Sequence, residues 1–337
     1  MAEPGTVRAP GVALFRLEFG GRAGWGHLVR SGALAAELRR RGWRCDLWTD
    51  SSVDAVPAEL RDAFDGLRRA AGSSHVPAGC DWLVIDHYGT SDDDIAAWRA
   101  GFSGGIVAMD DDRARTLASA DLVVNPRLGL AESPYASGVK ALLGERYALV
   151  RPAFRSPIRP QWLSPSGTTP VLVMLGGTDP AGATSEALHA LADVDAAGMV
   201  PLVVHPGQPA PCGAAREAFA RFAHAQWLGS LEAGRLAGWM AHARFAISAA
   251  GGSLYELAVV GVPFVSIVVA DNQRGLAEAA RARWGMPSVV AGPGLRHELA
   301  QAIAALRIRL ANTGAASPMI DGRGAERVAD VMSGRAD

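Results

Sequence analysis

Short, almost wholly apolar runs recur along this chain, and they constrain its fold more than any other feature of the sequence. In the first half they cover Val12–Leu17, Cys45–Thr49, Trp82–Ile85, Ile106–Met109 and Leu122–Val124. A strand with one solvated face alternates apolar and polar residues, whereas these runs do not alternate. Strands buried on both faces are typical of parallel sheets covered by helices. The first half is therefore predicted to be a doubly wound α/β domain.

The same pattern starts again after a segment rich in proline and serine. Residues 151–170 (RPAFRSPIRPQWLSPSGTTP) show no helical period and are predicted to link two domains. Further apolar runs follow at Val171–Leu175, Leu202–His205, Phe245–Ser248 and Phe264–Val269. We therefore predict two Rossmann-like domains, residues 1–155 and 156–337, which face a central cleft in the GT-B arrangement. The last helix, expected at Ala325–Met332, would pack back on the first domain.

Composition argues against several classes of protein. A chain of 337 residues suits two domains of about 150 residues each. The 33 basic and 34 acidic residues give a net charge of −1, which predicts neither a nucleic-acid partner nor binding to a membrane surface. We find no signal peptide and no membrane span, so a cytoplasmic monomer is expected. The cysteines Cys45, Cys80 and Cys212 lack the spacing of a disulfide framework or a metal site.

A glycine-rich turn follows the first strand and leads into a helix predicted at His27–Arg40. Gly24 and Gly26 let a ligand approach the backbone, and His27 opens the helix at the edge of the sheet where ligands bind. An imidazole there can act as a general base near neutral pH. The alternative is a histidine that caps or packs the helix. The spacing is not the GxGxxG of dinucleotide-binding proteins.

Asp86, His87 and Tyr88 directly follow another apolar run. Asp86 can orient a histidine or bind a sugar hydroxyl, and Tyr88 offers a hydrogen bond and a ring face. The alternative for Asp86 is a cap of the next turn. The acidic run Asp110–Asp112 is interpreted as a surface turn rather than a metal site, because consecutive side chains do not all point one way.

Glycine-rich turns also open two helices in the second half, and helix starts of this kind bind phosphate through backbone N–H groups. Glu256 lies one turn into the second helix, where its carboxylate can accept both ribose hydroxyls. The alternatives are an ordinary turn at the first site and a helix cap with a solvated Glu256 at the second. Asn272 and Gln273 follow the next strand. The predicted phosphate-binding residues are Gly176, Gly177, Thr178, Asp179, Gly251, Gly252 and Ser253.

Together these motifs resemble the hydrolase of the pseudaminic-acid pathway. The segments GWGHLVR, DHY, LGGTDP and AAGGSLYE, and the Asn-Gln pair, occur in that family's order from about Phe15 to Ala280. The later motifs are shared with the MurG-type glycosyltransferases. The resemblance implies a metal-independent enzyme without a cofactor. It would release UDP from UDP-2,4-diacetamido-2,4,6-trideoxy-β-L-altropyranose with inversion, for nonulosonic acid synthesis and flagellin or surface glycosylation.

The resemblance also implies roles for individual residues. His27 would be the base that activates water, and the catalytic residues Tyr88 and Asn272 would line the sugar site. UDP would be held at the glycine-rich helix starts, with Glu256 at the ribose. This mechanism requires an accessible His27 imidazole. The remaining residues assigned to the substrate are Glu18, Gly24, Gly26, Arg30, Asp86, His87 and Gln273.

The chain departs from the family at two places. Arg16-Leu17-Glu18 stands where the family usually has Arg-Ala-Asp, so the carboxylate is one methylene longer. Residues 181–183 are Ala-Gly-Ala where the family often has an asparagine. Two other functions fit the same motifs: a glycosyltransferase that moves the sugar to an alcohol, and a non-catalytic protein that binds a sugar nucleotide.

Overall fold

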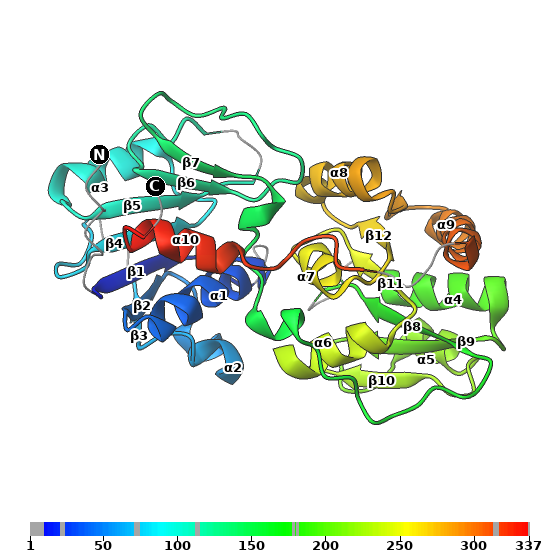
Figure 1. The fold of residues 1–337 in the computed structure, drawn as a ribbon. Helices are drawn as coiled ribbons and strands as arrows, with labels where there is room; N and C mark the ends of the chain where they lie inside the picture. Colours follow the sequence, from blue (N-terminus) through cyan, green and yellow to red (C-terminus); the bar gives the residue numbers. More distant parts are fainter. Residues whose placement is uncertain are drawn as a thin grey trace. The chain divides into compact units, whose positions relative to one another are not determined.

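The computed structural model describes residues 10–20, 24–70, 75–111, 115–176, 179, 182–312 and 317–335. The chain divides into two compact units (Figure 1). Unit 1 comprises Met1–Pro152 and Gly322–Asp337, and unit 2 comprises Ala153–Asp321. Each unit is built around its own parallel sheet, so each is described by itself.

Unit 1 contains a seven-stranded sheet in the order β3-β2-β1-β4-β5-β6-β7, and every neighbouring pair is parallel. Its strands are β1 (Val12–Leu17), β2 (Arg44–Thr49), β3 (Gly66–Arg69), β4 (Trp82–Asp86), β5 (Gly105–Met109), β6 (Leu122–Asn125) and β7 (Lys140–Leu143). Its helices are α1 (Gly26–Arg40), α2 (Ala58–Arg61), α3 (Asp92–Gly101) and α10 (Gly324–Met332), with short 3-10 turns at Val53–Ala55 and Glu145–Tyr147.

Both faces of this sheet are buried, as the apolar runs predict. Along β1, Phe15 packs into a cluster with Leu34 of α1 and Val328 of α10. Its neighbour Leu14 packs on the opposite face with Ile95 of α3. Successive side chains of a strand point to opposite faces, which explains why β1 is apolar without alternation.

Unit 2 contains a six-stranded parallel sheet in the order β10-β9-β8-β11-β12-β13. Its strands are β8 (Thr169–Met174), β9 (Met199–Val204), β10 (Gln226–Gly229), β11 (Phe245–Ala249), β12 (Phe264–Val268) and β13 (Ser288–Val290). Its helices are α4 (Ala183–Asp195), α5 (Gly213–Phe219), α6 (Ala233–His242), α7 (Ser253–Val260), α8 (Arg274–Trp284) and α9 (Leu295–Asn312), with 3-10 turns at Pro152–Arg155 and Asp271–Gln273. Helices α4 and α9 cover one face, where their apolar side chains pack on Val171 and Val173.

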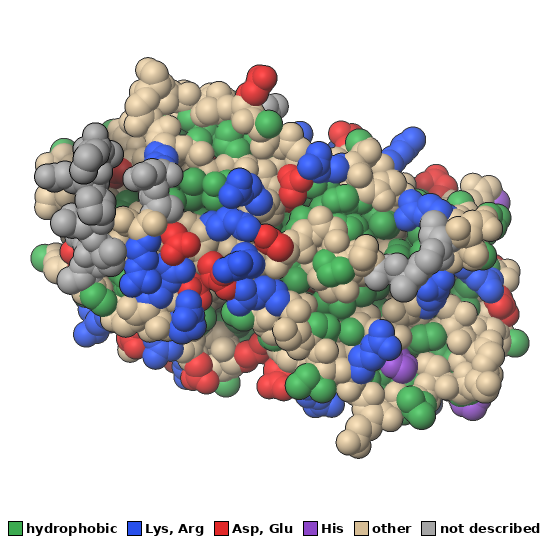
Figure 2. Space-filling model, in the orientation of Figure 1, with side chains coloured by type: hydrophobic (Ala, Val, Ile, Leu, Met, Phe, Trp, Pro, Cys, Tyr) green, Lys and Arg blue, Asp and Glu red, His purple; other side chains and the backbone are tan. Residues whose placement is uncertain are grey.

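The surface carries both signs of charge in close mixture. Figure 2 shows basic and acidic side chains interspersed on the face that displays α10. Two ion pairs of that helix are Arg41–Asp330, with the atoms 2.7 Å apart, and Arg323–Glu326, also at 2.7 Å. Among the described residues, no helix combines the length and the hydrophobicity needed to span a membrane.

Candidate functional site

Each sheet has a switch point where the strand order runs outward in both directions, and open α/β sheets bind ligands there. In unit 1 the switch point lies between β1 and β4, and in unit 2 between β8 and β11. The segments that follow β1 and β4 carry Glu18, His27 and Asp86. Gly176 and Gly251 follow β8 and β11. The predicted residues therefore gather at the two positions where this topology favours a ligand.

The imidazole of His27 faces a buried carboxylate. His27 is the second residue of α1, whose N-cap is Trp25, so His27 does not cap the helix. Its Nδ1 lies 3.9 Å from Oδ1 of Asp86, a residue that ends β4 and is 1% exposed. This separation is longer than a hydrogen bond. Because Nδ1 faces Asp86, Nε2 is the nitrogen that can exchange a proton with a bound molecule.

The glycines before His27 shape the turn that leads into α1. Gly24 has a φ of +66°, and it pairs through its backbone with Gly20, which has a φ of +77°. Such angles favour glycine. Gly26 is the first residue of α1.

Arg30 ties together two carboxylates of the site. Its Nε and Nη2 donate to the two oxygens of Asp86 at 2.7 and 2.5 Å, and its Nη1 donates to both oxygens of Asp111 at 2.7 and 3.0 Å. Ser31 adds a hydrogen bond to Asp86 at 3.0 Å. Burial disfavours the charge, but Asp111 and Asp86 outweigh it and raise the pKa of Arg30. Arg30 was predicted to bind substrate, and here its guanidinium holds these two side chains in place.

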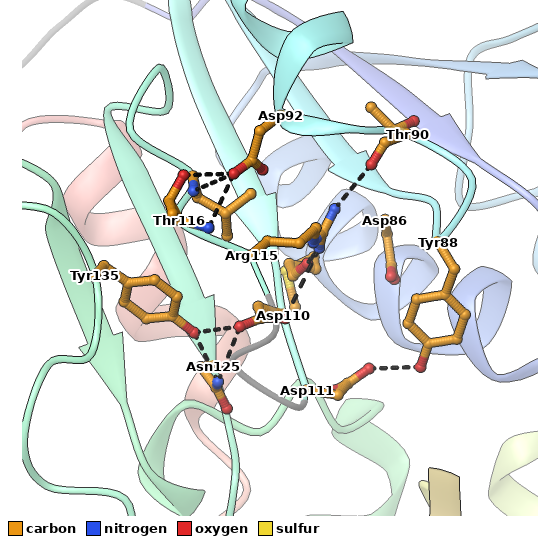
Figure 3. Close-up of polar contacts among 12 residues, drawn as sticks. Asp86, Tyr88, Thr90, Asp92, Asp110, Asp111, Arg115, Thr116, Asn125 and Tyr135 are labelled. Carbon is orange, nitrogen blue, oxygen red and sulfur yellow. Dashed lines mark hydrogen bonds and ion pairs between the residues drawn. The ribbon is translucent and has the colours of Figure 1, made fainter.

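The structure corrects the interpretation of Asp110 and Asp111 as a surface turn. Asp110 is 1% exposed, and Asp111 accepts hydrogen bonds from Arg30. The hydroxyl of Tyr88 also donates to Asp111 (Figure 3). Asp112 lies outside the described residues. Both aspartates follow β5 at the same edge as Asp86, so their position after an apolar run was the signal that could have identified them.

Tyr88 covers His27. The two rings meet edge to face with their centroids 4.4 Å apart, and Tyr88 itself is 50% exposed. Its hydroxyl donates to Oδ2 of Asp111 at 2.8 Å, and its backbone N–H donates to Oε1 of Glu18 at 3.0 Å. Burial and the charge of Asp111 both raise the pKa of Tyr88, so the hydroxyl keeps its proton at neutral pH.

The expectation of an accessible His27 is wrong for this conformation. His27 is only 4% exposed, and among the described residues Nδ1 has no hydrogen-bond partner. The T-shaped contact with Tyr88 accounts for part of this burial. The Tyr88 ring therefore covers part of the imidazole surface.

A second histidine lies nearby among acidic residues. Nε2 of His87 is 4.0 Å from Oε2 of Glu18 and 3.9 Å from Oδ2 of Asp50. Burial and the neighbouring Arg16 lower the pKa of His87, while Glu18 and Asp50 oppose this shift. Arg16 pairs with Asp50 and lies over the ring of Trp48, with the guanidinium carbon 5.1 Å from the ring centroid. Asp50 follows β2, a position that sequence reasoning missed.

A buried polar network supports the segment that carries Asp111. The hydroxyl of Tyr135 donates to Oδ2 of Asp110 at 2.6 Å, and Nδ2 of Asn125 donates to the Tyr135 oxygen at 2.7 Å. On the other side, Arg115 donates to the backbone carbonyls of Met109 and Thr90 at 2.6 and 3.3 Å (Figure 3). These bonds link the segments that follow β4 and β5.

In unit 2 the start of α7 presents backbone donors at the switch point. The N–H groups of Leu254 and Tyr255 donate to the carbonyls of Gly251 and Gly252. The N–H groups of Gly252 and Ser253 have no acceptor within the described part of the chain. With the helix dipole, these two groups form a site that can bind an anion.

Glu256 lies in the first turn of α7, and Asn272 and Gln273 follow the neighbouring strand β12. Glu256 is buried, so the alternative of a solvated glutamate is wrong. Oε1 of Gln273 accepts the N–H of Val269 at 3.0 Å. A Cβ added at Gly251 would lie 3.9 Å from Nε2 of Gln273. Asn272 lies in the 3-10 turn before α8 and is exposed.

The turn after β8 contains a helix cap. The two oxygens of Asp179 accept the N–H groups of Ala183 and Thr184, each at 2.9 Å. The start of α4 is therefore already bound by a carboxylate. Gly176 precedes it with a φ of +90°, and the predicted residues Gly177 and Thr178 lie outside the described residues. In the described ranges, no three His, Cys, Asp or Glu side chains are grouped so that they could hold a metal ion.

Comparison with solved structures defines the class of fold. The chain matches MurG of Acinetobacter baumannii with a TM-score of 0.63 and 13% identity, over 96% of this chain and 99% of that one. It matches a complex of Staphylococcus aureus MnaA with UDP with a TM-score of 0.61 and 13% identity, over 95% and 94%. The chain therefore has the GT-B fold, with two parallel-sheet, Rossmann-like units.

A curated relative is similar along nearly the whole chain. The spore coat polysaccharide biosynthesis protein SpsG of Bacillus subtilis (strain 168) is 24% identical, over 92% of this chain and 94% of its own length. The sequence matches no family model.

Proposed function

We propose that this protein hydrolyses a UDP-linked 2,4-diacetamido-2,4,6-trideoxy sugar at the anomeric C–O bond. The observation that carries the proposal is the position of His27 beside Asp86 at the switch point of unit 1, with Nδ1 and Oδ1 3.9 Å apart. With Nδ1 turned to this carboxylate, Nε2 is the nitrogen proposed to take the proton.

In the proposed reaction, a water molecule attacks C1 of the sugar. Its oxygen bonds to C1, its proton passes to Nε2 of His27, and the bond from C1 to the phosphate oxygen breaks. UDP leaves with the bonding electrons, and the configuration at C1 inverts. Tyr88 and Asn272 are proposed to contact the sugar.

UDP is proposed to bind in unit 2, with its phosphates at the N–H groups of Gly252 and Ser253 and its ribose at Glu256. The unused donors at the start of α7 support this assignment. The fold shared with the MnaA–UDP complex supports the choice of nucleotide. The similarity to a spore coat polysaccharide biosynthesis protein supports a role in surface glycan synthesis.

The direct test measures UDP release by NMR from the UDP-linked sugar named above. Wild-type protein is expected to release UDP with EDTA present, and His27→Gln is expected to be slower by roughly a hundredfold or more. The exposed His224 provides the control, since His224→Gln is expected to retain full activity. Equal rates for His27→Gln and wild type would show that His27 is not the base. UDP binding without turnover would favour the non-catalytic alternative.

The phosphate site has its own test. Gly252 has a φ of −54°, and a Cβ built there meets no atom within 4 Å, so other residues fit. Gly252→Asp places a carboxylate at the helix start, where it competes with phosphate. It is expected to abolish the thermal stabilisation by UDP, whereas Gly252→Ala retains most of it. Unchanged stabilisation in Gly252→Asp would rule out this phosphate site.

A glycosyltransferase is the second candidate, favoured by the match to MurG. An alcohol would then replace water at the same base. UDP release that rises sharply with glycerol or N-acetylglucosamine as acceptor would support a transferase over a hydrolase.

A further inference from the structure

The Tyr88 ring, which is bound to Asp111, lies over the imidazole of His27. His27 is 4% exposed beneath a tyrosine that is itself 50% exposed. The aromatic contact is a single edge-to-face pair, with the centroids 4.4 Å apart. Such a ring can rotate away if the bond that fixes its hydroxyl is broken.

Only one side-chain partner fixes that hydroxyl among the described residues, namely Oδ2 of Asp111 at 2.8 Å. Asp111 is itself held by Arg30 through both oxygens, and Arg30 is anchored on Asp86. The carboxylate that receives the Tyr88 hydroxyl is therefore fixed to the same Arg30–Asp86 pair that faces His27.

We infer that Asp111 is a positioning residue that holds Tyr88 as a removable cover over His27. The importance of the cover for catalysis rests on the proposed role of His27, but the cover itself does not. A bound molecule that donates a hydroxyl or amide N–H to Asp111 competes with Tyr88 for the same oxygen. When the ligand replaces the Tyr88 hydroxyl at Asp111, the Tyr88 ring is free to move off His27. Access to His27 is therefore coupled to the binding of ligands that carry neutral hydrogen-bond donors.

Burial of the Tyr88 hydroxyl and the charge of Asp111 both raise the pKa of Tyr88. Burial opposes the charge of Asp111, but Arg30 outweighs it and lowers the pKa of Asp111. Donor and acceptor thus keep their protonation states around neutral pH, and the hydrogen bond persists there.

The test measures how fast diethyl pyrocarbonate modifies His27 in the full-length protein without ligand, by peptide mass spectrometry. Near pH 8 an ordinary imidazole is neutral and reactive. Tyr88→Phe loses the hydroxyl but leaves the Asp111–Arg30 pair intact. It is expected to speed modification of His27 by roughly tenfold or more, the factor that a lost hydrogen bond to a charged acceptor implies. Asp111→Asn is expected to act in the same direction, and Tyr88→Ala to have the largest effect.

Two histidines of unit 2 serve as internal references in every sample: the exposed His224 and the buried His205. Their rates are expected to stay unchanged, which shows that a variant has not unfolded. The inference is overturned if wild-type His27 reacts as fast as His224, or if Tyr88→Ala leaves the His27 rate unchanged. Neither outcome depends on UDP release, so failure of the cover and failure of the hydrolase are distinguishable.

Discussion

At the scale of single residues, the hydroxyl of Tyr135 is expected to contribute to stability through the buried polar network that supports Asp111. This buried hydroxyl joins Asp110 and Asn125. Tyr135→Phe removes the 2.6 Å hydrogen bond to Oδ2 of Asp110. Because losing a buried hydrogen bond to a charged group is costly, we expect the free energy of unfolding in urea to fall by about 1–3 kcal/mol. Tyr147→Phe is the control and should change it by less than about 0.5 kcal/mol. Equal losses in both variants would contradict the prediction.

His87 carries a prediction of pH dependence. Burial and Arg16 lower its pKa in the folded protein, while an unfolded histidine titrates near ~6.5. As the pH falls from about 7 to 5, the unfolded chain takes up a proton that the folded chain resists. Stability is therefore lost as the pH falls through this range. His87→Gln should flatten this part of the curve of unfolding free energy against pH. His224→Gln should not, and an identical slope for wild type and His87→Gln would refute the assignment.

The sequence predicted which residues gather at the switch points, but not how they pair. Asp86 and Tyr88 were identified because polar residues that end apolar runs meet at one edge of a parallel sheet. The long-range pairing of Asp111 with Arg30 depends on which strands are neighbours, and the neighbour order of β4 and β5 is set by tertiary packing. The burial of His27 was also out of reach, because it depends on tertiary contacts such as the ring contact with Tyr88.

At the scale of elements, the strands that the sequence predicted are those whose two faces are both buried. β1 has the expected bounds, Val12–Leu17, and all of its residues after the first are buried. The missed strands are β3 (GLRR), β7 (KALL), β10 (QWLG) and β13 (SVV). They lie at the edges of their sheets, where they are short and partly exposed, so they lack an apolar run.

Helix α4 gives a prediction at this scale, since the carboxylate of Asp179, which was predicted to bind UDP, accepts two N–H groups at the start of this helix. Asp179→Ala should lower the midpoint of urea unfolding by an amount equivalent to about 1 kcal/mol. Asp179→Asn should lose much less, because asparagine also caps helices and tolerates the φ of +40° found here. Calorimetric titration should give UDP affinities close to wild type for both variants. A large loss of UDP affinity with unchanged stability would instead support the predicted role of Asp179 in binding UDP.

At the scale of the whole molecule, the chain leaves unit 1 near Pro152 and returns to it at Gly322. Helix α10 thereby completes the core of unit 1, where Met332 packs with Leu38 of α1. Its last residue also accepts a hydrogen bond, because Nε1 of Trp82 donates to the Met332 carbonyl at 3.1 Å. The stability of unit 1 therefore depends on the last residues of the sequence.

This connectivity predicts that core damage stays within one unit. Met332→Ala should destabilise unit 1 by about 2–5 kcal/mol, because it removes a buried side chain from a packed core. Hydrogen exchange should then accelerate in β1 and β4 but not in β8 and β11, since protection follows the opening free energy of each cooperative unit. Leu310→Ala removes a buried side chain of α9 from the core of unit 2 and is the matched variant. It should accelerate exchange in β8 and β11 but not in β1 and β4. If Met332→Ala accelerated exchange equally in β8, the two units would unfold as one body.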